Sequence, residues 1–222
     1  LIILFCFSCY SIYWNILLMS IFRKLNEFKN RTAIILDGKK VITYSKLLKD
    51  SKNVTDKIKK RSLILILGGN NYETISSYIG LINIKSVILM LDKNISQSFL
   101  ADIIKNYKPH FIFSPKQREI PKSYSIFYDF KDYRILKQNI NKVIKLNKDL
   151  AVLLTTSGTT GSKKFVKQSY KNYEDNSKKI INSLGIKKNS SVITTLPISY
   201  TYGLSIINTH LISGATIILN ES

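Results

Sequence analysis

The first half of the chain alternates short apolar runs with segments whose apolar residues recur at helical spacing. The runs 63–67, 87–91 and 111–113 are continuously apolar, which is typical of parallel strands buried on both faces. Between them, segments 72–82 and 99–107 carry apolar residues along one helical stripe. Strand, helix and strand at this spacing predict right-handed crossovers, and so a doubly wound α/β fold with largely parallel sheets and flanking helices.

Turn and cap residues mark the ends of several of these elements. Asp37-Gly38 lies between two apolar segments and predicts a hairpin turn. Thr43 is a suitable N-cap for the helix that follows it. Ser169 is a suitable N-cap for a second helix, which we expect to reach Leu184 with that leucine facing inward. Gly185 then ends this helix.

The sequence divides into three predicted segments: an apolar stretch at 1–22, a first α/β subdomain at 23–148, and the start of a second at 149–222. Prolines and lysines interrupt the pattern over 114–148, where we expect a variable connection with one or two short elements. Residues 1–22 are long and apolar enough to cross a bilayer. Three interpretations of them stay open, namely a membrane anchor, an inserted leader, or sequence upstream of a true start at Met19.

Composition narrows the class of protein. A length of 222 residues with 45% hydrophobic residues fits one or two globular domains. A net charge of +20 is typical of proteins that bind nucleic acid, anionic membranes or acidic ligands. The basic residues in excess are nearly all lysines and are scattered along the chain, which favours a solvated surface over nucleic-acid binding. Cysteine occurs only at Cys6 and Cys9, so the rest of the chain fits a reducing cytoplasm, with membrane association through residues 1–22 left open.

The most unusual stretch is 156–164, which contains five hydroxyl side chains, two glycines, two lysines and no acid. It lies between the apolar run 151–154 and the alternating run 165–168, so we expect a loop between two strands. Glycines allow backbone N–H groups to form a concave anion-binding nest, while hydroxyls and a terminal lysine add donors and charge. This combination suits a polyphosphate. The alternative is a surface turn rich in small polar residues.

The loop is not a Walker A motif. That motif requires four residues between its glycines, followed by Gly-Lys-Ser/Thr and a helix. Here only Thr159 and Thr160 separate Gly158 from Gly161, and a strand-like segment follows.

The stretch Thr156-Ser157-Gly158-Thr159-Thr160-Gly161-Ser162-x-Lys164 resembles the phosphate loop of the AMP-forming adenylate enzymes, which include acyl-CoA synthetases, peptide-synthetase adenylation domains and luciferases. The family pattern is Thr-Ser-Gly-Thr-Thr-Gly-x-Pro-Lys-Gly, so Lys163 and Phe165 replace a proline and a glycine. A second element of the family, Pro-x-x-His/aromatic-x-x-Gly, lies at the acyl end of its active site. Pro197 to Gly203 fits this spacing, with Tyr200 at the aromatic position.

The resemblance implies ATP-dependent activation of a carboxylic acid as an acyl-adenylate, followed by transfer to a thiol, either coenzyme A or a carrier-protein pantetheine. Tyr200 and Gly203 would border the acid pocket. The residues implied to bind ATP are Thr156, Ser157, Gly158, Thr159, Thr160, Gly161 and Lys164.

The resemblance covers roughly residues 20–222. The family's adenine- and Mg²⁺-binding Tyr-Gly-x-Thr-Glu segment, its ribose-binding aspartate and its C-terminal lysine domain do not occur in this sequence. We therefore expect an N-terminal part of such an enzyme, inactive by itself, and assign no catalytic residue and no Mg²⁺ ligand in it.

The two histidines are not predicted to take part in the chemistry. His110 and His210 have no carboxylate, serine or cysteine arranged around them in sequence, so we interpret both as structural. No His/Cys pairs occur at ligand spacing, and no metal site is predicted. Two other functions remain open: a non-catalytic membrane-associated or degenerate binding protein on the same fold, and a basic nucleic-acid-binding module.

Overall fold

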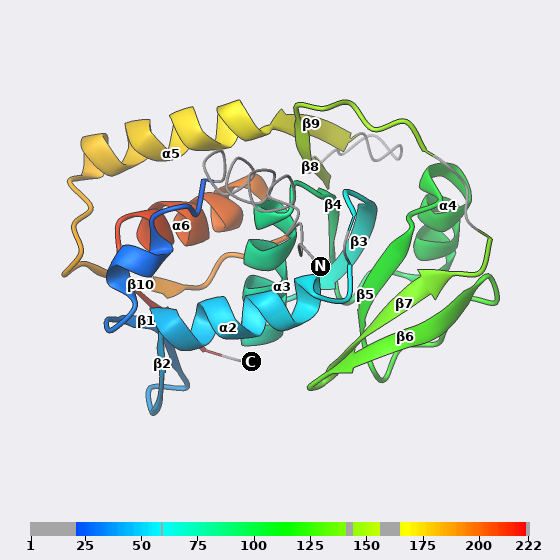
Figure 1. Cartoon of the computed structure of the whole chain (residues 1–222), viewed down its shortest axis with the longest axis horizontal. Coiled ribbons are helices and arrows are strands. Elements are labelled where there is room, and N and C mark those ends of the chain that lie inside the picture. The colour runs from blue at the N-terminus through cyan, green and yellow to red at the C-terminus, as the bar shows by residue number, and fades with distance from the viewer. Residues whose placement is uncertain (1–20, 59, 141–143, 156–164, 221–222) are drawn as a thin grey trace, which may run out of the picture.

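The computed structural model describes residues 21–58, 60–140, 144–155 and 165–220. In this part of the chain the strands form a larger and a smaller sheet, with helices packed against both (Figure 1). The larger sheet has the order β6 (Tyr124–Phe130), β7 (Tyr133–Gln138), β5 (Phe111–Pro115), β3 (Leu63–Gly68), β4 (Val87–Asp92), β8 (Leu150–Thr155) and β9 (Phe165–Ser169). The smaller sheet has the order β10 (Ser191–Thr194), β11 (Thr216–Leu219), β1 (Thr32–Leu36) and β2 (Lys40–Thr43). The helices described are η1 (Leu25–Phe28), α2 (Tyr44–Thr55), α3 (Tyr72–Asn83), α4 (Gln97–Tyr107), α5 (Tyr170–Leu184) and α6 (Thr201–Ile212).

The centre of the larger sheet is parallel and doubly wound, as the apolar runs predict. Strands β5, β3, β4 and β8 are parallel neighbours, with Leu63 opposite Val87 and Gly68 opposite Asp92. Ile64 and Ile66 of β3 belong to the core that also contains residues of α3, whereas its alternate leucines pack with α4. Both faces of β3 are therefore buried, which explains why its sequence is continuously apolar.

The smaller sheet joins the beginning of the described chain to its end. Asp37 and Gly38 both have positive φ angles, as the predicted hairpin turn between β1 and β2 requires. Strand β1 also pairs in parallel with β11, with Ile34 opposite Ile217. Sequence periodicity gives no sign of this second pairing, because its partners are more than 180 residues apart.

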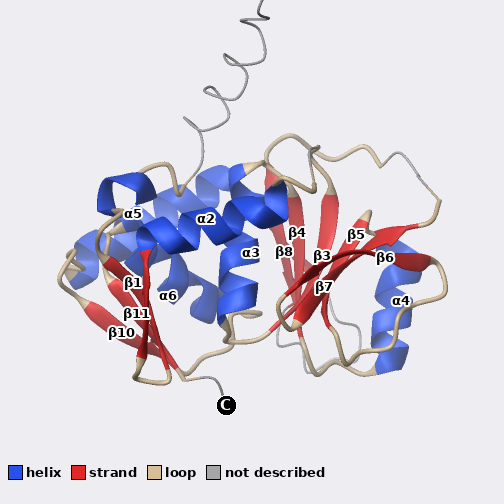
Figure 2. Cartoon of the chain, turned by 60° about the horizontal axis from the view of Figure 1, so that its bottom comes forward, coloured by secondary structure: helices blue, strands red, loops and turns tan. Residues whose placement is uncertain are grey.

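Helix α3 lies between the two sheets (Figure 2) and is buried along nearly its whole length. The Tyr78 hydroxyl on α3 donates a hydrogen bond to Asn208 Oδ1 on α6 at 3.0 Å. On α2, the Tyr44 hydroxyl donates to the Ala215 carbonyl oxygen, just before β11, at 2.7 Å. These buried bonds join α3 to α6, and α2 to the segment just before β11 of the smaller sheet.

The predicted helix caps are confirmed, and one prediction about packing is wrong. The side chains of Thr43 and Ser169 accept hydrogen bonds from the backbone three residues later, and Gly185 ends α5 with a φ of 62°. Leu184, however, is 71% exposed. It borders an open cavity between α5 and α6 and does not face the core.

Each sheet contains strands from both sides of position 149, where the second subdomain is predicted to start. In the larger sheet, β8, which follows that position, pairs with β4, which precedes it, and β9 pairs with β8. In the smaller sheet, β1, which precedes that position, pairs with β11, which follows it, and β2 pairs with β1. The interrupted segment before position 149 contributes β6 and β7, an antiparallel hairpin that extends the larger sheet. The division into 23–148 and 149–222 stays a prediction about subdomains.

Candidate active site

The connection between β10 and α6 carries the predicted acid-pocket element, and Asn70 holds it from the larger sheet. The Asn70 side-chain amide donates from Nδ2 to the Leu196 carbonyl oxygen at 3.0 Å. Its Oδ1 accepts the Ile198 N–H at 2.9 Å. Asn70 lies two residues after the end of β3, so these two bonds attach the turn around Pro197 to the carboxyl end of a central strand.

Gly203 lies in the first turn of α6, where the helix closely approaches the Pro197 turn. A Cβ atom at Gly203 would lie 2.2 Å from the Pro197 carbonyl oxygen and 2.8 Å from that of Leu196. The turn is also closed by a hydrogen bond from the Tyr200 N–H to the Pro197 carbonyl oxygen at 3.1 Å. The spacing between Pro197 and Gly203 therefore reflects direct contact between backbones, which a side chain would prevent.

Tyr200 is the N-cap residue of α6, with an extended backbone and no capping bond from its side chain. Its side chain is partly exposed, as is that of Tyr202. The structure thus brings Tyr200 and Gly203 together in one turn, as the sequence predicts. Their role in binding an acid stays a prediction.

The predicted phosphate-binding residues Thr156, Ser157, Gly158, Thr159, Thr160, Gly161 and Lys164 lie outside the described residues. The strands that flank them are described and are antiparallel neighbours, with Thr155 opposite Phe165. The expected arrangement of a loop between two strands is therefore confirmed for its flanks. Leu154 pairs with Met90, two residues before Asp92, so β8 ends at the same edge of the sheet as β4.

A polar cleft of about 610 Å³ opens at this edge and extends to the carboxyl ends of the smaller sheet. Helices α3 and α4 leave β3 and β4 toward opposite faces, so this is a topological switch point, where open α/β sheets bind their ligands. The Thr194 hydroxyl is buried at the cleft and has no hydrogen-bond partner in the described part of the chain. The lining residues are Gly69, Asn70, Asn71, Glu73, Asp92, Lys93, Pro115, Gln117, Asp132, Tyr133, Thr194, Thr195, Pro197 and Asn220.

A second cavity, of about 540 Å³, lies between α5 and α6 and begins next to Tyr200. Two of its hydroxyls are already bonded to their own helix, since Ser205 donates to Thr201 O and Thr209 to Ser205 O. Burial lowers the pKa of His210 below its ordinary value, which keeps the imidazole neutral near pH 7. The lining residues that the structure describes carry no charge at that pH: Asn176, Ile180, Ser183, Leu184, Ile186, Thr201, Tyr202, Ser205, Ile206, Thr209 and His210.

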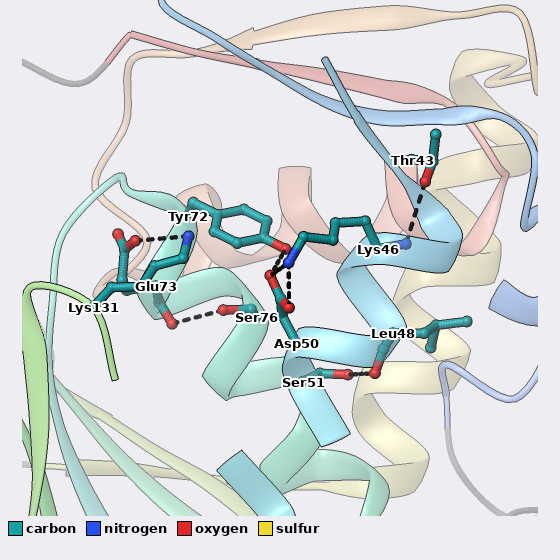
Figure 3. A network of polar contacts seen from close by, with 9 residues as sticks. All are labelled: Thr43, Lys46, Leu48, Asp50, Ser51, Tyr72, Glu73, Ser76 and Lys131. Carbon is teal, nitrogen blue, oxygen red and sulfur yellow. Dashed lines mark hydrogen bonds and ion pairs between the residues drawn. The ribbon is translucent and has the colours of Figure 1, made fainter. Parts of the chain in front are cut away.

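A network of charged and phenolic groups supports the first turn of α3 beside the cleft (Figure 3). The buried Asp50 carboxylate accepts hydrogen bonds from Lys46 Nζ at 2.5 and 2.6 Å and from the Tyr72 hydroxyl at 2.8 Å. Lys131 Nζ lies 3.1 Å from Glu73 Oε1 and 4.0 Å from the centroid of the Tyr72 ring. Burial, and then the Asp50 carboxylate, raise the pKa of the Tyr72 phenol, so it stays a neutral donor.

In the structure, the Nδ1 atom of each histidine lies close to a backbone group. His110 Nδ1 accepts the Leu63 N–H at 3.0 Å, and His210 Nδ1 lies 2.9 Å from the Ile206 carbonyl oxygen in its own helix. The described residues contain no group of three His, Cys, Asp or Glu side chains placed to hold a metal ion.

A family model described as AMP-binding enzyme matches residues 21–222. The chain belongs to the AMP-binding enzyme family. Two curated relatives of this chain are 2-succinylbenzoate–CoA ligases. That of Staphylococcus epidermidis is 36% identical over 91 residues, which cover 40% of this chain and 19% of the relative. That of Listeria monocytogenes is 25% identical over 202 residues, which cover 86% of this chain and 42% of the relative. The chain thus spans less than half the length of these relatives.

Solved structures share the fold of this chain. Apo MatB from Rhodopseudomonas palustris superposes with a TM-score of 0.69 at 18% identity, over 90% of this chain and 45% of MatB. O-succinylbenzoate coenzyme A synthetase (MenE) from Bacillus subtilis, in complex with AMP, gives a TM-score of 0.71 at 19% identity, over 90% of this chain and 55% of MenE. The predicted α/β fold class is confirmed.

Residues 1–20 lie outside the described residues, so the three interpretations of the apolar stretch stay predictions. In the part that the structure describes, no helix combines the length and apolarity that crossing a membrane requires.

The sequence does not predict the contacts of Asn70 or the cleft. The sequence does show an asparagine after the first buried strand, but a polar residue in that place is equally typical of a helix cap. Its contact with residues 196 and 198 depends on the packing of two sheets, which no local pattern encodes.

Proposed function

We propose that this chain supplies the triphosphate-binding loop and part of the acid pocket of an enzyme that activates a carboxylic acid with ATP. A carboxylate oxygen attacks the α-phosphorus, the bond to the β-phosphate oxygen breaks, and pyrophosphate leaves. The acyl-adenylate then passes its acyl group to a thiol and releases AMP. The observation that carries this proposal is the family match over 21–222 together with the hydroxyl- and glycine-rich loop between β8 and β9.

The loop's part in this chemistry is electrostatic. Its N–H groups and hydroxyls would hold the β- and γ-phosphates in line, and Lys164 would neutralise charge on the departing pyrophosphate. The flanking strands support this assignment because the loop starts at the edge of the sheet where the polar cleft opens. The turn from Pro197 to Gly203 lies between that cleft and the cavity beside α6, so it would place the acid's carboxylate near the α-phosphate.

We further propose that the acid has an uncharged body. The described lining of the cavity between α5 and α6 is aliphatic, aromatic, amide, hydroxyl or neutral imidazole. A second carboxylate buried there would lack a cationic partner among the described residues, which is strongly unfavourable. This distinguishes the expected substrate from 2-succinylbenzoate, which the relatives' names specify and which carries two carboxylates.

ATP binding tests the proposal directly. Isothermal titration should detect ATP binding to the purified chain, and Lys164→Ala should weaken it roughly tenfold or more, the effect of losing one charge-assisted contact of about 1.5–3 kcal/mol. The matched control is Lys163→Ala, whose affinity we expect within about twofold to threefold of wild type. Equal losses in the two variants, or no ATP binding at all, would refute the assignment of the loop.

The acid is tested separately by adding benzoate or 2-succinylbenzoate to the ATP-bound chain and following each by saturation-transfer NMR. We expect a signal for benzoate and a weaker one for the dicarboxylate; the reverse order would overturn the uncharged-body proposal. We also expect that this chain alone does not exchange labelled pyrophosphate into ATP, since the adenine-binding segment and the lysine domain of the family do not occur in its sequence.

A further inference from the structure

Asn70 connects two parts of the candidate active site that are far apart in sequence. Its side chain reaches from the end of β3 to residues 196 and 198, which are 126 and 128 positions away. The two bonds use both chemical groups of the amide: Nδ2 donates to Leu196 O, and Oδ1 accepts from Ile198 N–H. Pro197 between these residues has no N–H, so Asn70 binds a backbone group on each side of it.

The residues on either side of Asn70 are held by hydrogen bonds to α3 and β7. The preceding Gly69 N–H donates to the Thr74 hydroxyl in α3 at 3.2 Å. The following Asn71 caps α3 by accepting the Thr74 N–H, and its Nδ2 donates to the Tyr133 hydroxyl at 2.9 Å. The two asparagines therefore hold different partners: Asn71 binds within the larger sheet and its helix, and Asn70 binds the smaller sheet's connection.

The Pro197 turn, which Asn70 binds, contacts the first turn of α6. The Pro197 carbonyl oxygen accepts the Tyr200 N–H, and the Tyr200 carbonyl oxygen accepts the Leu204 N–H at 3.0 Å. Gly203 packs against the same Pro197 carbonyl. A displacement at Pro197 would therefore move the first turn of α6 and the tyrosine at its start.

We propose that Asn70 is a positioning residue: its amide aligns the acid-binding turn with the edge of the larger sheet from which the phosphate loop starts. This inference rests on the proposed function. It requires an amide, because one short side chain must offer a donor and an acceptor at once. An ionised aspartate offers acceptors only, so it would keep the bond from Ile198 N–H but direct an oxygen at the Leu196 carbonyl.

The test compares a ligand that spans the turn and the loop with one that needs the loop alone. The probes are a benzoyl-adenylate analogue with a sulfamate in place of the phosphate, and ATP, both titrated calorimetrically. We expect Asn70→Asp to weaken the analogue tenfold or more and ATP less than twofold. Asn139→Asp is the matched control, because the Asn139 amide also donates and accepts hydrogen bonds but lines neither the polar cleft nor the cavity between α5 and α6, and it should change both affinities less than twofold. Asn70→Ala, which adds no charge, is measured alongside in case the aspartate variant does not fold.

Each outcome decides the question. If the Asn70 variants and Asn139→Asp bind the analogue equally well, or if the Asn70 variants lose affinity for ATP as much as for the analogue, Asn70 has no positioning role. If wild type binds neither probe, the proposed function is refuted and this role with it. The hydrogen bond to Asn70 also protects the Ile198 amide proton, which should exchange faster with solvent in Asn70→Ala than in Asn139→Asp.

Discussion

Replacing Gly203 with alanine tests the close contact between α6 and the Pro197 turn. The new Cβ would lie 2.2 Å from the Pro197 carbonyl oxygen and 2.7 Å from its carbonyl carbon. Real Cβ contacts almost never fall below 3.0 Å, so the helix and the turn must separate by about 0.8 Å. Both neighbours are backbone atoms, which Asn70 and the Tyr200 N–H hold in place, so no flexible side chain can move aside.

The expected magnitude follows from two opposing effects. Overpacking of this kind destabilises by about 1–3 kcal/mol. Alanine gains up to about 1 kcal/mol over glycine inside a helix, which offsets part of it. We therefore expect Gly203→Ala to lower the free energy of unfolding by about 1–2 kcal/mol, which corresponds to a fall in Tm of roughly 2–4 °C per kcal/mol for a chain of this size.

Urea unfolding followed by circular dichroism measures this difference. Ser205→Ala, two residues further along α6, is the matched control and should stay within about 0.5 kcal/mol of wild type. Gly80→Ala provides a comparison away from the site, since its Cβ would lie 2.4 Å from the Ser51 carbonyl oxygen between α2 and α3. A Gly203→Ala variant as stable as Ser205→Ala would show that the close approach to Pro197 is not present in solution.

Three further substitutions test the buried polar contacts. Tyr44→Phe removes the hydroxyl that donates to the Ala215 carbonyl oxygen, and should cost about 1–2 kcal/mol in urea unfolding at constant m-value. Asp50→Asn weakens the charge-assisted bonds that tie α2 to Tyr72, and should lower the free energy of unfolding by about 1–2 kcal/mol, measured as a lower thermal midpoint with an unchanged far-ultraviolet spectrum. For His210, burial lowers the pKa, so the unfolded chain takes up a proton first as pH falls through about 6.5. Stability is thus lost below that pH, and His210→Gln should flatten this part of the profile of unfolding free energy against pH; an unchanged slope would contradict the assignment.

The sequence predicts the parts of the fold that depend on local patterns. Continuous apolar runs identify β3, β4 and β5, because strands buried on both faces leave no polar positions. The caps at Thr43 and Ser169 and the turn at Asp37-Gly38 are confirmed because their chemistry acts within a few residues.

Other features depend on which distant segments meet, and the sequence does not predict them. The cleft combines residues from the ends of both sheets, and Asn70 gains its partners only when those sheets pack. Leu184 illustrates the limit of periodicity, since its helical spacing suits an inward position yet its side chain is largely exposed at the end of α5. Periodicity gives the face of a helix but not how far along the helix its neighbours extend.

The parallel pairing of β1 with β11 has a consequence for biosynthesis. Ile34 leaves the ribosome about 180 residues before its partner Ile217, a delay of roughly 10–40 s at usual rates of translation. Until then the hairpin of β1 and β2 has an unpaired edge on the side that β11 will occupy, and such edges invite association with other chains. We expect nascent chains to need protection of this hairpin by chaperones, and its closure to be a late, slow step, as is usual for contacts of high sequence separation.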